Sequence, residues 1–155
     1  MTVQPLTVRA VTPGDFAEWK PLWRGYNRFY GRDELPEEIT HMTWSRFFDA
    51  YEPVHALIAE RAGRLEGLVH YLFHRSTIQI EPTCYLQDLY TDEAARSRGV
   101  GRMLIEAVYQ QARKSGCKRV YWHTHETNLT AIKLYDRVAE RSGFIVYRKQ
   151  IGSAD

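Results

Sequence analysis

The stretch RSRGVGRML, residues 96–104, lies between an apolar run of β-forming residues and a long amphipathic helical segment. Gly99 and Gly101 lack a Cβ, so the backbone of this loop can come close to a bound group. The first N–H groups of the helix that follows have no partner within the helix and, together with the helix dipole, attract an anion. Positive charge around the two glycines comes from Arg96, Arg98 and Arg102. The stretch therefore favours a strand–loop–helix unit that binds a phosphate group.

Other glycine-rich loops fit this stretch less well. A P-loop would need a Gly-Lys-Ser/Thr ending, which residues 99–104 (GVGRML) lack. A dinucleotide-binding fingerprint would need a third glycine at position 104, where this chain has Leu104. An ordinary structural turn stays open, because a Gly-x-Gly pair by itself is a common motif.

The composition is that of one globular domain over residues 1–155 and does not suggest a protein that binds nucleic acid or spans a membrane. The 21 basic residues nearly balance the 19 acidic ones, for a net charge of +2, and they form no basic stripe. No apolar run is long enough to span a bilayer and no signal-peptide pattern opens the chain, which favours a cytoplasmic protein. Cys84 and Cys117 fit reduced, packed side chains.

The order of predicted elements indicates an α/β (α+β) fold. β-rich runs predict strands over residues 6–12, 54–61, 65–75, 84–91, 119–125 and 144–151. Amphipathic spacing predicts helices over residues 15–30, after Pro36, from the glycine pair to Gly116, and from Asn128 to Gly143. The helix after Pro36 is expected to present an apolar side made of Ile39, Met42, Trp44, Phe47 and Phe48. Interleaved strands and helices predict a central sheet with helices on both faces.

A second motif downstream of the loop points to a family. Asn128 and Tyr135 are two helical turns apart, so both project from nearly one face of the last predicted helix. The loop pattern R-x-x-G-x-G, then N-x-x-A-x-x-L-Y over residues 128–135, then Gly143-Phe144, resembles the GNAT superfamily of acetyl-CoA-dependent N-acetyltransferases.

The resemblance extends to particular branches of that superfamily. Residues 85–91 (YLQDLYT) and the loop resemble spermidine/spermine acetyltransferases. Residues 121–128 (YWHTHETN) and 135–144 (YDRVAERSGF) resemble yeast-type histone/polyamine and D-amino-acid acetyltransferases. The family implies a mixed sheet of about six to seven strands, a homodimer, acetyl-CoA as co-substrate and no metal.

The resemblance also implies how acetyl-CoA is bound. Backbone N–H groups of residues 98–102 would hold the pyrophosphate, and the strand end at residues 89–91 would pair with the pantetheine arm and polarise the thioester carbonyl. The expected contacts are Leu89, Tyr90, Thr91, Arg96, Arg98, Gly99, Val100, Gly101, Arg102, Asn128 and Tyr135.

In the mechanism that the family implies, an amine attacks the acetyl carbon directly and Tyr135 returns a proton to the CoA sulfur. No covalent enzyme intermediate is needed, so neither cysteine acts as a nucleophile. The base is left open. The polyamine enzymes have a glutamate where this chain has Gln87, so Asp88, His123 with the neighbouring His125, and a water relay are the candidates. A zinc site at the two histidines and Glu126 is not expected, because a second ligand cluster is missing.

The acceptor is expected to be a small primary amine, contacted by Gln87, Tyr30 and Glu34. Glu34 belongs to an acidic cluster with Asp33, Glu37 and Glu38 that could attract a cation or could simply be a solvated helix start. Three other functions stay open. The chain could bind CoA without turnover as a regulator, acetylate a protein amine, or be an interaction domain in which the loop is a plain turn.

Overall fold

The computed structural model describes residues 2–152. The chain divides into two compact units, with the boundary between His123 and Thr124. The first unit contains the sheet, the helices packed on it and the glycine loop, and the second contains one helix and the chain that follows it.

A five-stranded sheet forms the first unit, in the order β1-β2-β3-β4-β5. The strands are β1 (Thr7–Ala10), β2 (Val54–Arg61), β3 (Arg64–His74), β4 (Thr83–Thr91) and β5 (Val120–Tyr121). The first four strands pair antiparallel, whereas β4 and β5 are parallel. The β2–β3 hairpin turns at Ala62 (φ 52°) and Gly63 (φ 77°), a left-handed pair that matches the twist of the two strands. The predicted class, a mixed sheet within an α/β fold, is confirmed.

The strand count is lower than expected, and the difference lies at the end of the chain. The strand predicted over residues 119–125 shortens to the two residues of β5, which pair only with Cys84 and Tyr85. The strand predicted over residues 144–151 is not formed, since no strand pairing in the described part of the chain involves these residues. Alternating apolar residues favour a strand, but a strand also needs a neighbouring backbone to hydrogen-bond with.

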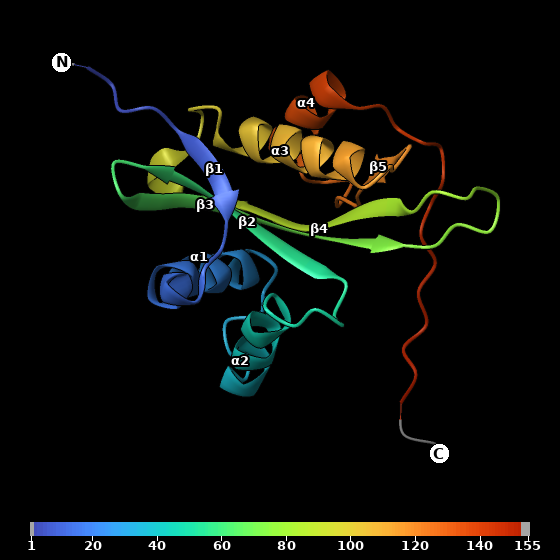
Figure 1. Cartoon of the computed structure of the whole chain (residues 1–155), viewed down its shortest axis with the longest axis horizontal. Coiled ribbons are helices and arrows are strands. Elements are labelled where there is room, and N and C mark those ends of the chain that lie inside the picture. The colour runs from blue at the N-terminus through green and yellow to red at the C-terminus, as the bar shows by residue number, and fades with distance from the viewer. Residues whose placement is uncertain (1, 153–155) are drawn as a thin grey trace. The chain divides into compact units, whose positions relative to one another are not determined.

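Helices cover both faces of the sheet, as predicted (Figure 1). Helices α1 (Phe16–Phe29) and α2 (Glu37–Arg46) lie on one face, and α3 (Val100–Lys114) lies on the other. Two short 3-10 turns, η1 (Pro13–Asp15) and η2 (Glu93–Ala95), precede α1 and α3. The α1 face of the core consists of Trp19, Leu22, Trp23, Tyr26, Ile58, Leu65 and Leu68.

The apolar side predicted for α2 is only partly correct. Trp44 and Phe47 pack against the core as expected, but Ile39, Met42 and Phe48 are exposed. The one buried residue of α2 is Thr40. Because 40, 44 and 47 follow the helical spacing of i, i+4 and i+7, they rather than residues 39 and 42 form the inner face of this short helix.

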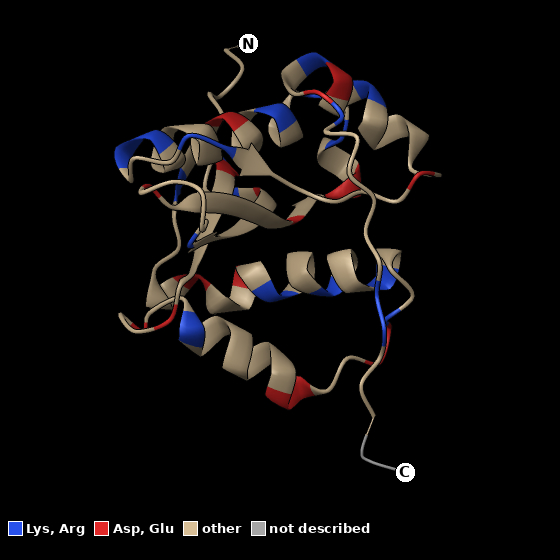
Figure 2. Ribbon diagram, turned by 90° about the vertical axis from the view of Figure 1, so that its right-hand side faces the viewer, with Lys and Arg blue, Asp and Glu red and all other residues tan. Residues whose placement is uncertain are grey.

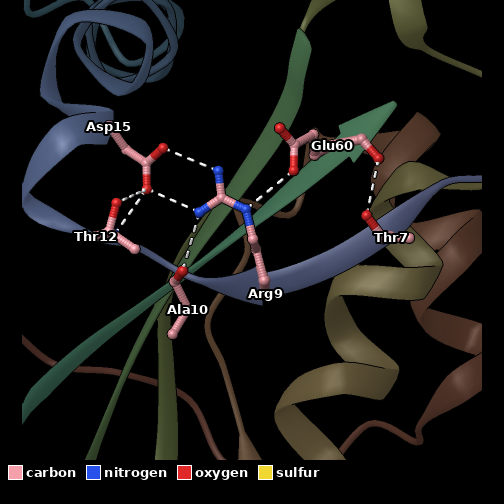
Figure 3. A network of polar contacts seen from close by, with 6 residues as sticks. All are labelled: Thr7, Arg9, Ala10, Thr12, Asp15 and Glu60. Carbon is pink, nitrogen blue, oxygen red and sulfur yellow. Dashed lines mark hydrogen bonds and ion pairs between the residues drawn. The ribbon is translucent and has the colours of Figure 1, made fainter. Parts of the chain in front are cut away.

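A network of polar contacts fastens β1 to the start of α1 (Figure 3). The guanidinium of Arg9 donates from both terminal nitrogens to the carboxylate of Asp15, at 2.8 and 2.9 Å, and from Nε to Glu60 at 3.0 Å. The backbone N–H and the hydroxyl of Thr12 donate to the same Asp15 carboxylate, at 2.7 and 2.9 Å. Arg9 thereby holds the pKa of the Asp15 carboxyl well below its usual range.

The second unit contains α4 (Leu129–Val138). Asn128 occupies the predicted N-cap position, although its side chain makes no capping hydrogen bond. The helix ends at Val138 rather than at Gly143, because Ala139 already has an extended backbone.

Candidate active site

The parallel strands β4 and β5 stay together for only two residues. The register pairs Cys84 with Val120 and Tyr85 with Tyr121, and the N–H of Cys84 donates to the carbonyl of Arg119 at 3.0 Å. Beyond Tyr85, β4 continues to Thr91 in register with β3 alone. The edge of β4 over residues 86–91 therefore has backbone groups that no strand of the described chain pairs.

A β-bulge interrupts β4 at this same point. His70 pairs with Asp88 and Tyr71 pairs with Leu86, which leaves Gln87 as an extra residue without a partner on β3. A bulge of this kind bends the strand and redirects the side chains that follow it. It turns the side chain of Asp88 toward the α1 face of the sheet, where it meets His70.

The glycine loop has the backbone needed for an anion at the start of α3. Gly99 is left-handed (φ 83°) at the N-cap position of the helix, and Ser97 shares this conformation (φ 63°). No side chain caps the helix, so its first N–H groups stay available. A Cβ placed on Gly67 of β3 would lie 2.8 Å from Cγ1 of Val100, so this glycine lets the start of α3 lie close against the sheet.

Side chains of the loop connect it to the end of β4. Arg96 donates from Nε to the carbonyl of Thr91 at 3.3 Å, and its guanidinium lies 5.7 Å from the centre of the Tyr90 ring. Tyr90 in turn packs against Gly25 of α1, where any Cβ would clash with its hydroxyl. The loop, the edge of β4 and α1 are thus joined through Arg96 and Tyr90.

Asp88 is the centre of a buried polar cluster. Its Oδ2 lies 2.9 Å from Nδ1 of His70, a residue that is only 2% exposed. Nε2 of His70 accepts a hydrogen bond from the indole N–H of Trp19 at 3.1 Å. Because an indole nitrogen can only donate, Nε2 carries no proton, and the remaining ring proton sits on Nδ1 and is donated to Asp88. His70 is therefore a neutral imidazole with its tautomer fixed by Trp19.

Three tyrosines surround the same carboxylate. Burial, the charge of Asp88 and a hydrogen bond with it raise the pKa of Tyr26 far above its usual value. Burial and the charge of Asp88 also raise the pKa values of Tyr30 and Tyr85. All three phenols stay protonated at neutral pH and can act toward Asp88 only as hydrogen-bond donors.

His123 lies beside the point where β4 and β5 part. Its Nδ1 is 3.3 Å from the hydroxyl of Tyr85, and the rings of Tyr85 and Tyr121 stack with their centres 5.0 Å apart. The hydroxyl of Tyr121 is 2.7 Å from Nε2 of His74. His123 and Asp88, the two candidate bases within the first unit, thus both lie beside Tyr85.

Two of the four residues in the acidic cluster between α1 and α2 are paired with basic residues of α1, which Figure 2 shows spaced along that helix. Glu37 accepts from Lys20 at 2.7 Å and from Arg24 at 2.9 Å, and these bonds lower its pKa to about 2. Asp33 lies 3.4 Å from Arg28. The attraction that this cluster could offer to a cation is reduced accordingly, and Glu34 stays a prediction.

The remaining predicted residues lie in the second unit. Tyr135 is in α4, one turn from its C-terminal end, and Asn128 directly precedes the helix. Nδ1 of His125 accepts a hydrogen bond from the backbone N–H of Thr127 at 3.2 Å and lies 2.7 Å from the hydroxyl oxygen of the same residue.

Among residues 2–152, no group of three or more His, Cys, Asp or Glu side chains is placed to hold a metal ion. Within the same range, no helix has the length and apolar character needed to cross a membrane.

These features, a parted strand pair, a bulge and an uncapped helix start, occur in a chain whose residues 19–139 match the sequence profile of the Acetyltransferase (GNAT) family. The chain belongs to the GNAT family. It is 36% identical over 146 residues to the D-amino-acid N-acetyltransferase HPA3 of Saccharomyces cerevisiae, with 93% of this chain and 90% of that protein covered. The aminoglycoside N(6')-acetyltransferase type 1 of Serratia marcescens is 33% identical over 73 residues, 46% of this chain and 50% of that protein. Like these relatives, this GNAT chain is an N-acetyltransferase.

Solved structures share the fold of this GNAT chain. The aminoglycoside N-acetyltransferase AAC(6')-Iy in complex with CoA aligns with a TM-score of 0.82 and 16% identity over 96% of this chain and 97% of that one. A ribosomal-protein-alanine N-acetyltransferase of Brucella melitensis aligns with a TM-score of 0.79 and 17% identity over 95% and 99% of the two chains. At these identities the likeness concerns the fold alone.

Several residues of the site were not anticipated from the sequence of this acetyltransferase. His70 stands in an apolar run, LVHYLF, where a histidine is ordinarily a core residue. Trp19 and Tyr26 follow the apolar spacing of α1, so their polar atoms gave no separate signal. The clearest available signal was the presence of a histidine and an aspartate on consecutive strands of one hairpin.

Proposed function

We propose that this chain transfers the acetyl group of acetyl-CoA to the primary amine of a small molecule by direct attack. The observation that carries the proposal is the parting of β4 from β5 next to the uncapped start of α3. The first leaves a strand edge open to an extended ligand, and the second offers N–H groups to an anion. A pantetheine arm that ends in a pyrophosphate needs both.

The residues of the loop fit acetyl-CoA as a substrate. Backbone N–H groups of residues 98–102 hold the pyrophosphate, with left-handed Gly99 shaping the turn. The edge of β4 at Leu89, Tyr90 and Thr91 pairs with the pantetheine arm and polarises the thioester carbonyl. Arg96, Arg98, Val100, Gly101 and Arg102 complete the expected contacts, and Asn128 is carried over from the family resemblance.

Asp88 is the general base in this proposal. Its Oδ2 is held by the Nδ1–H of His70, and it also accepts a hydrogen bond from the protonated phenol of Tyr26, so it is an oriented carboxylate beside the bulge. It accepts a proton from the acceptor ammonium, and the freed amine nitrogen forms a bond to the acetyl carbon. The C–S bond then breaks as the departing sulfur takes a proton from the phenol of Tyr135, the general acid implied by the family. The second proton of the attacking nitrogen passes through solvent and restores that phenol, so the products are the acetamide and the CoA thiol, and Asp88 releases its proton to water. His123 and a water relay are the competing bases.

Cysteine chemistry is not part of this mechanism. Cys84 is fully buried, and burial together with Cys117 raises its pKa to about 12, so it is a neutral thiol at physiological pH. Direct transfer from CoA to the amine needs no enzyme nucleophile.

Relatives support a small amine as the acceptor, since their names give D-amino acids, L-ornithine and aminoglycosides as substrates. Tyr30, which lies beside Asp88, and Gln87 in the bulge are the proposed acceptor contacts within the first unit, together with Glu34. We further propose that the chain forms a homodimer and acts in the cytoplasm. Light scattering during size-exclusion chromatography measures the molar mass and so the number of chains in the assembly.

A thiol-release assay with acetyl-CoA and a panel of amines tests the proposed function. We expect release of CoA that depends on both the acetyl donor and an amine. Binding of acetyl-CoA by calorimetry without release for any amine would instead favour a CoA-binding regulator. The absence of both binding and release would favour an interaction domain in which the loop is only a turn.

A further inference from the structure

A buried amide holds Arg32 in one orientation at the end of α1. The Nε of Arg32 donates to Oδ1 of Asn27 at 2.8 Å, and its backbone N–H donates to the carbonyl of Asn27, also at 2.8 Å. Asn27 is only 2% exposed, and its Nδ2 donates to the carbonyl of Trp23 at 2.9 Å. Both polar atoms of this buried side chain are therefore used, one of them to hold an arginine at the surface.

The two terminal nitrogens of Arg32 are left for another partner. The guanidinium lies over the rings of Tyr30 and Tyr26, with 5.2 and 5.7 Å to the ring centres. Within residues 2–152, no carboxylate lies within ion-pair distance of it, whereas Arg24 and Arg28 of α1 are both paired. A guanidinium fixed at Nε, with its terminal N–H groups available, has the geometry for a two-pronged bond to a carboxylate.

Arg32 and Asp88 act on the same pair of tyrosines. Tyr26 is hydrogen-bonded to Asp88 and carries Arg32 against its ring, so one residue separates the two charges. The negative charge of Asp88 raises the pKa of Tyr30, after burial, and the positive charge of Arg32 lowers it. A positive and a negative group thus face one aromatic wall of the candidate active site.

We infer that the acceptor is an α-amino acid, whose carboxylate is bound by Arg32 while its amine is presented to Asp88. The two groups of an amino acid carry the charges complementary to those of the two residues, and only one carbon separates them. This inference rests on the proposed function, since it takes Asp88 as the base.

Acetylation of matched pairs of compounds tests this subsite. Alanine, phenylalanine and lysine, each as the D and the L form, are compared with ethylamine, 2-phenylethylamine and cadaverine, which are the same amines without the carboxylate. The variants are Arg32→Gln and Arg32→Lys, and Arg28→Gln is the control, because it removes a nearby arginine that is already paired with Asp33.

We expect Arg32→Gln to lower kcat/KM for the preferred amino acid roughly 10- to 100-fold, the factor that a hydrogen-bonded charge pair represents. Activity on the matching amine should change less than about threefold, within the range of an ordinary surface substitution. Arg32→Lys should recover only part of the loss, because an ammonium cannot bind two carboxylate oxygens side by side. Arg28→Gln should behave as the wild type.

Calorimetry of the same compounds in the presence of CoA separates this inference from the proposed function. Amino acids that bind in an Arg32-dependent way without being acetylated would overturn the proposed function and leave the carboxylate subsite intact. Amines that are acetylated as well as or better than the amino acids would overturn the subsite and leave the proposed function intact. The subsite would also be overturned if Arg32→Gln lowered kcat/KM equally for an amino acid and its matching amine. The same holds if the wild type bound no amino acid.

Discussion

Asp88 and His70 face each other across β4 and β3, with 2.9 Å between the Oδ2 of the carboxylate and the Nδ1 of the imidazole. The pair is adjacent to the bulge at Gln87, so this irregularity in β4, which lies beside the open strand edge, also sets the direction of the carboxylate. Trp19 completes the arrangement from α1 by donating to the far nitrogen of the ring. Backbone geometry and side-chain chemistry thus meet at one position of the sheet.

Replacing Asp88 tests its role as the base. Asp88→Asn keeps the shape of the side chain but cannot accept a proton, so we expect kcat to fall about 10²- to 10⁴-fold, the range for general-base catalysis. Affinity for acetyl-CoA, measured by calorimetry, should be unchanged. Asp49→Asn, at an exposed position after α2, is the control. Retention of kcat in Asp88→Asn would move the role to His123 or to water.

Variants of His70 test whether it positions Asp88 through its Nδ1–H. His70→Leu removes the donor that holds Oδ2 of Asp88, so kcat should fall about 10- to 100-fold, the effect of a misplaced catalytic group, while the affinity for acetyl-CoA stays unchanged. His70→Asn offers an N–H at nearly the same place and should recover part of that loss. A purely structural role would lower stability in both variants, and His70→Asn would then recover no kcat. The groups that face Asp88 are Tyr26, Tyr30, Tyr85 and His70.

Tyr135→Phe tests the general acid. Loss of the phenol proton should reduce acetyl transfer roughly 10²-fold or more while the affinity for CoA stays within a factor of two or so of the wild type. The effect should shrink for acyl donors with a more acidic leaving thiol, because these need less help from an acid. Tyr51→Phe serves as the control, since Tyr51 is almost fully exposed. An unchanged rate in Tyr135→Phe would mean that the thiolate leaves without help from this residue.

Gly99→Ala tests the loop, with Gly63→Ala as a closely matched control. Both glycines are left-handed, at φ 83° and φ 77°, and a Cβ on either meets no atom within 4 Å. Each variant should therefore lose about 1 kcal/mol of unfolding free energy from backbone strain alone. Only Gly99→Ala should raise the KM for acetyl-CoA, because only Gly99 shapes the proposed pyrophosphate site. Equal KM values in the two variants would contradict that site.

Much of this fold could be predicted from local patterns, because those patterns reflect local physics. The hairpin turn at Ala62 and Gly63, the helix start after Gly99 and the apolar face of α1 each depend on a few neighbouring residues. The bulge at Gln87 could not be predicted, because it is defined by the register with β3 and not by β4 itself. The missing strand at residues 144–151 has the same origin, since its formation depends on a backbone partner elsewhere.

The site was predictable to the extent that a motif describes it. The glycine loop and the end of β4 stood out because their residue types are unusual for plain turns and strands. The contact of His70 with Trp19 joins two different elements, β3 and α1. The contact of Arg32 with Asn27 uses a buried side chain on the inner face of α1, where the sequence pattern predicts only packing. Such pairs carry no sequence signature, and only the packing of α1 on the sheet brings the first of them together.

The Arg9–Asp15 pair gives a pH-dependent prediction for stability. Because Arg9 lowers the pKa of Asp15 in the folded state, the pair stabilises the fold above the unfolded-state pKa of about 3.9, and this contribution is lost as the pH falls through the lower folded-state value. Asp15→Asn should reduce the free energy of unfolding at pH 7 by about 1–2 kcal/mol, a range that allows for the partial exposure of Arg9. In urea titrations, the difference from the wild type should narrow as the pH falls below about 4. Asp33→Asn, which breaks a more exposed pair with Arg28, should change stability by less than about 0.5 kcal/mol at either pH. A difference between Asp15→Asn and the wild type that did not depend on pH would show that the Asp15 charge does not stabilise the fold.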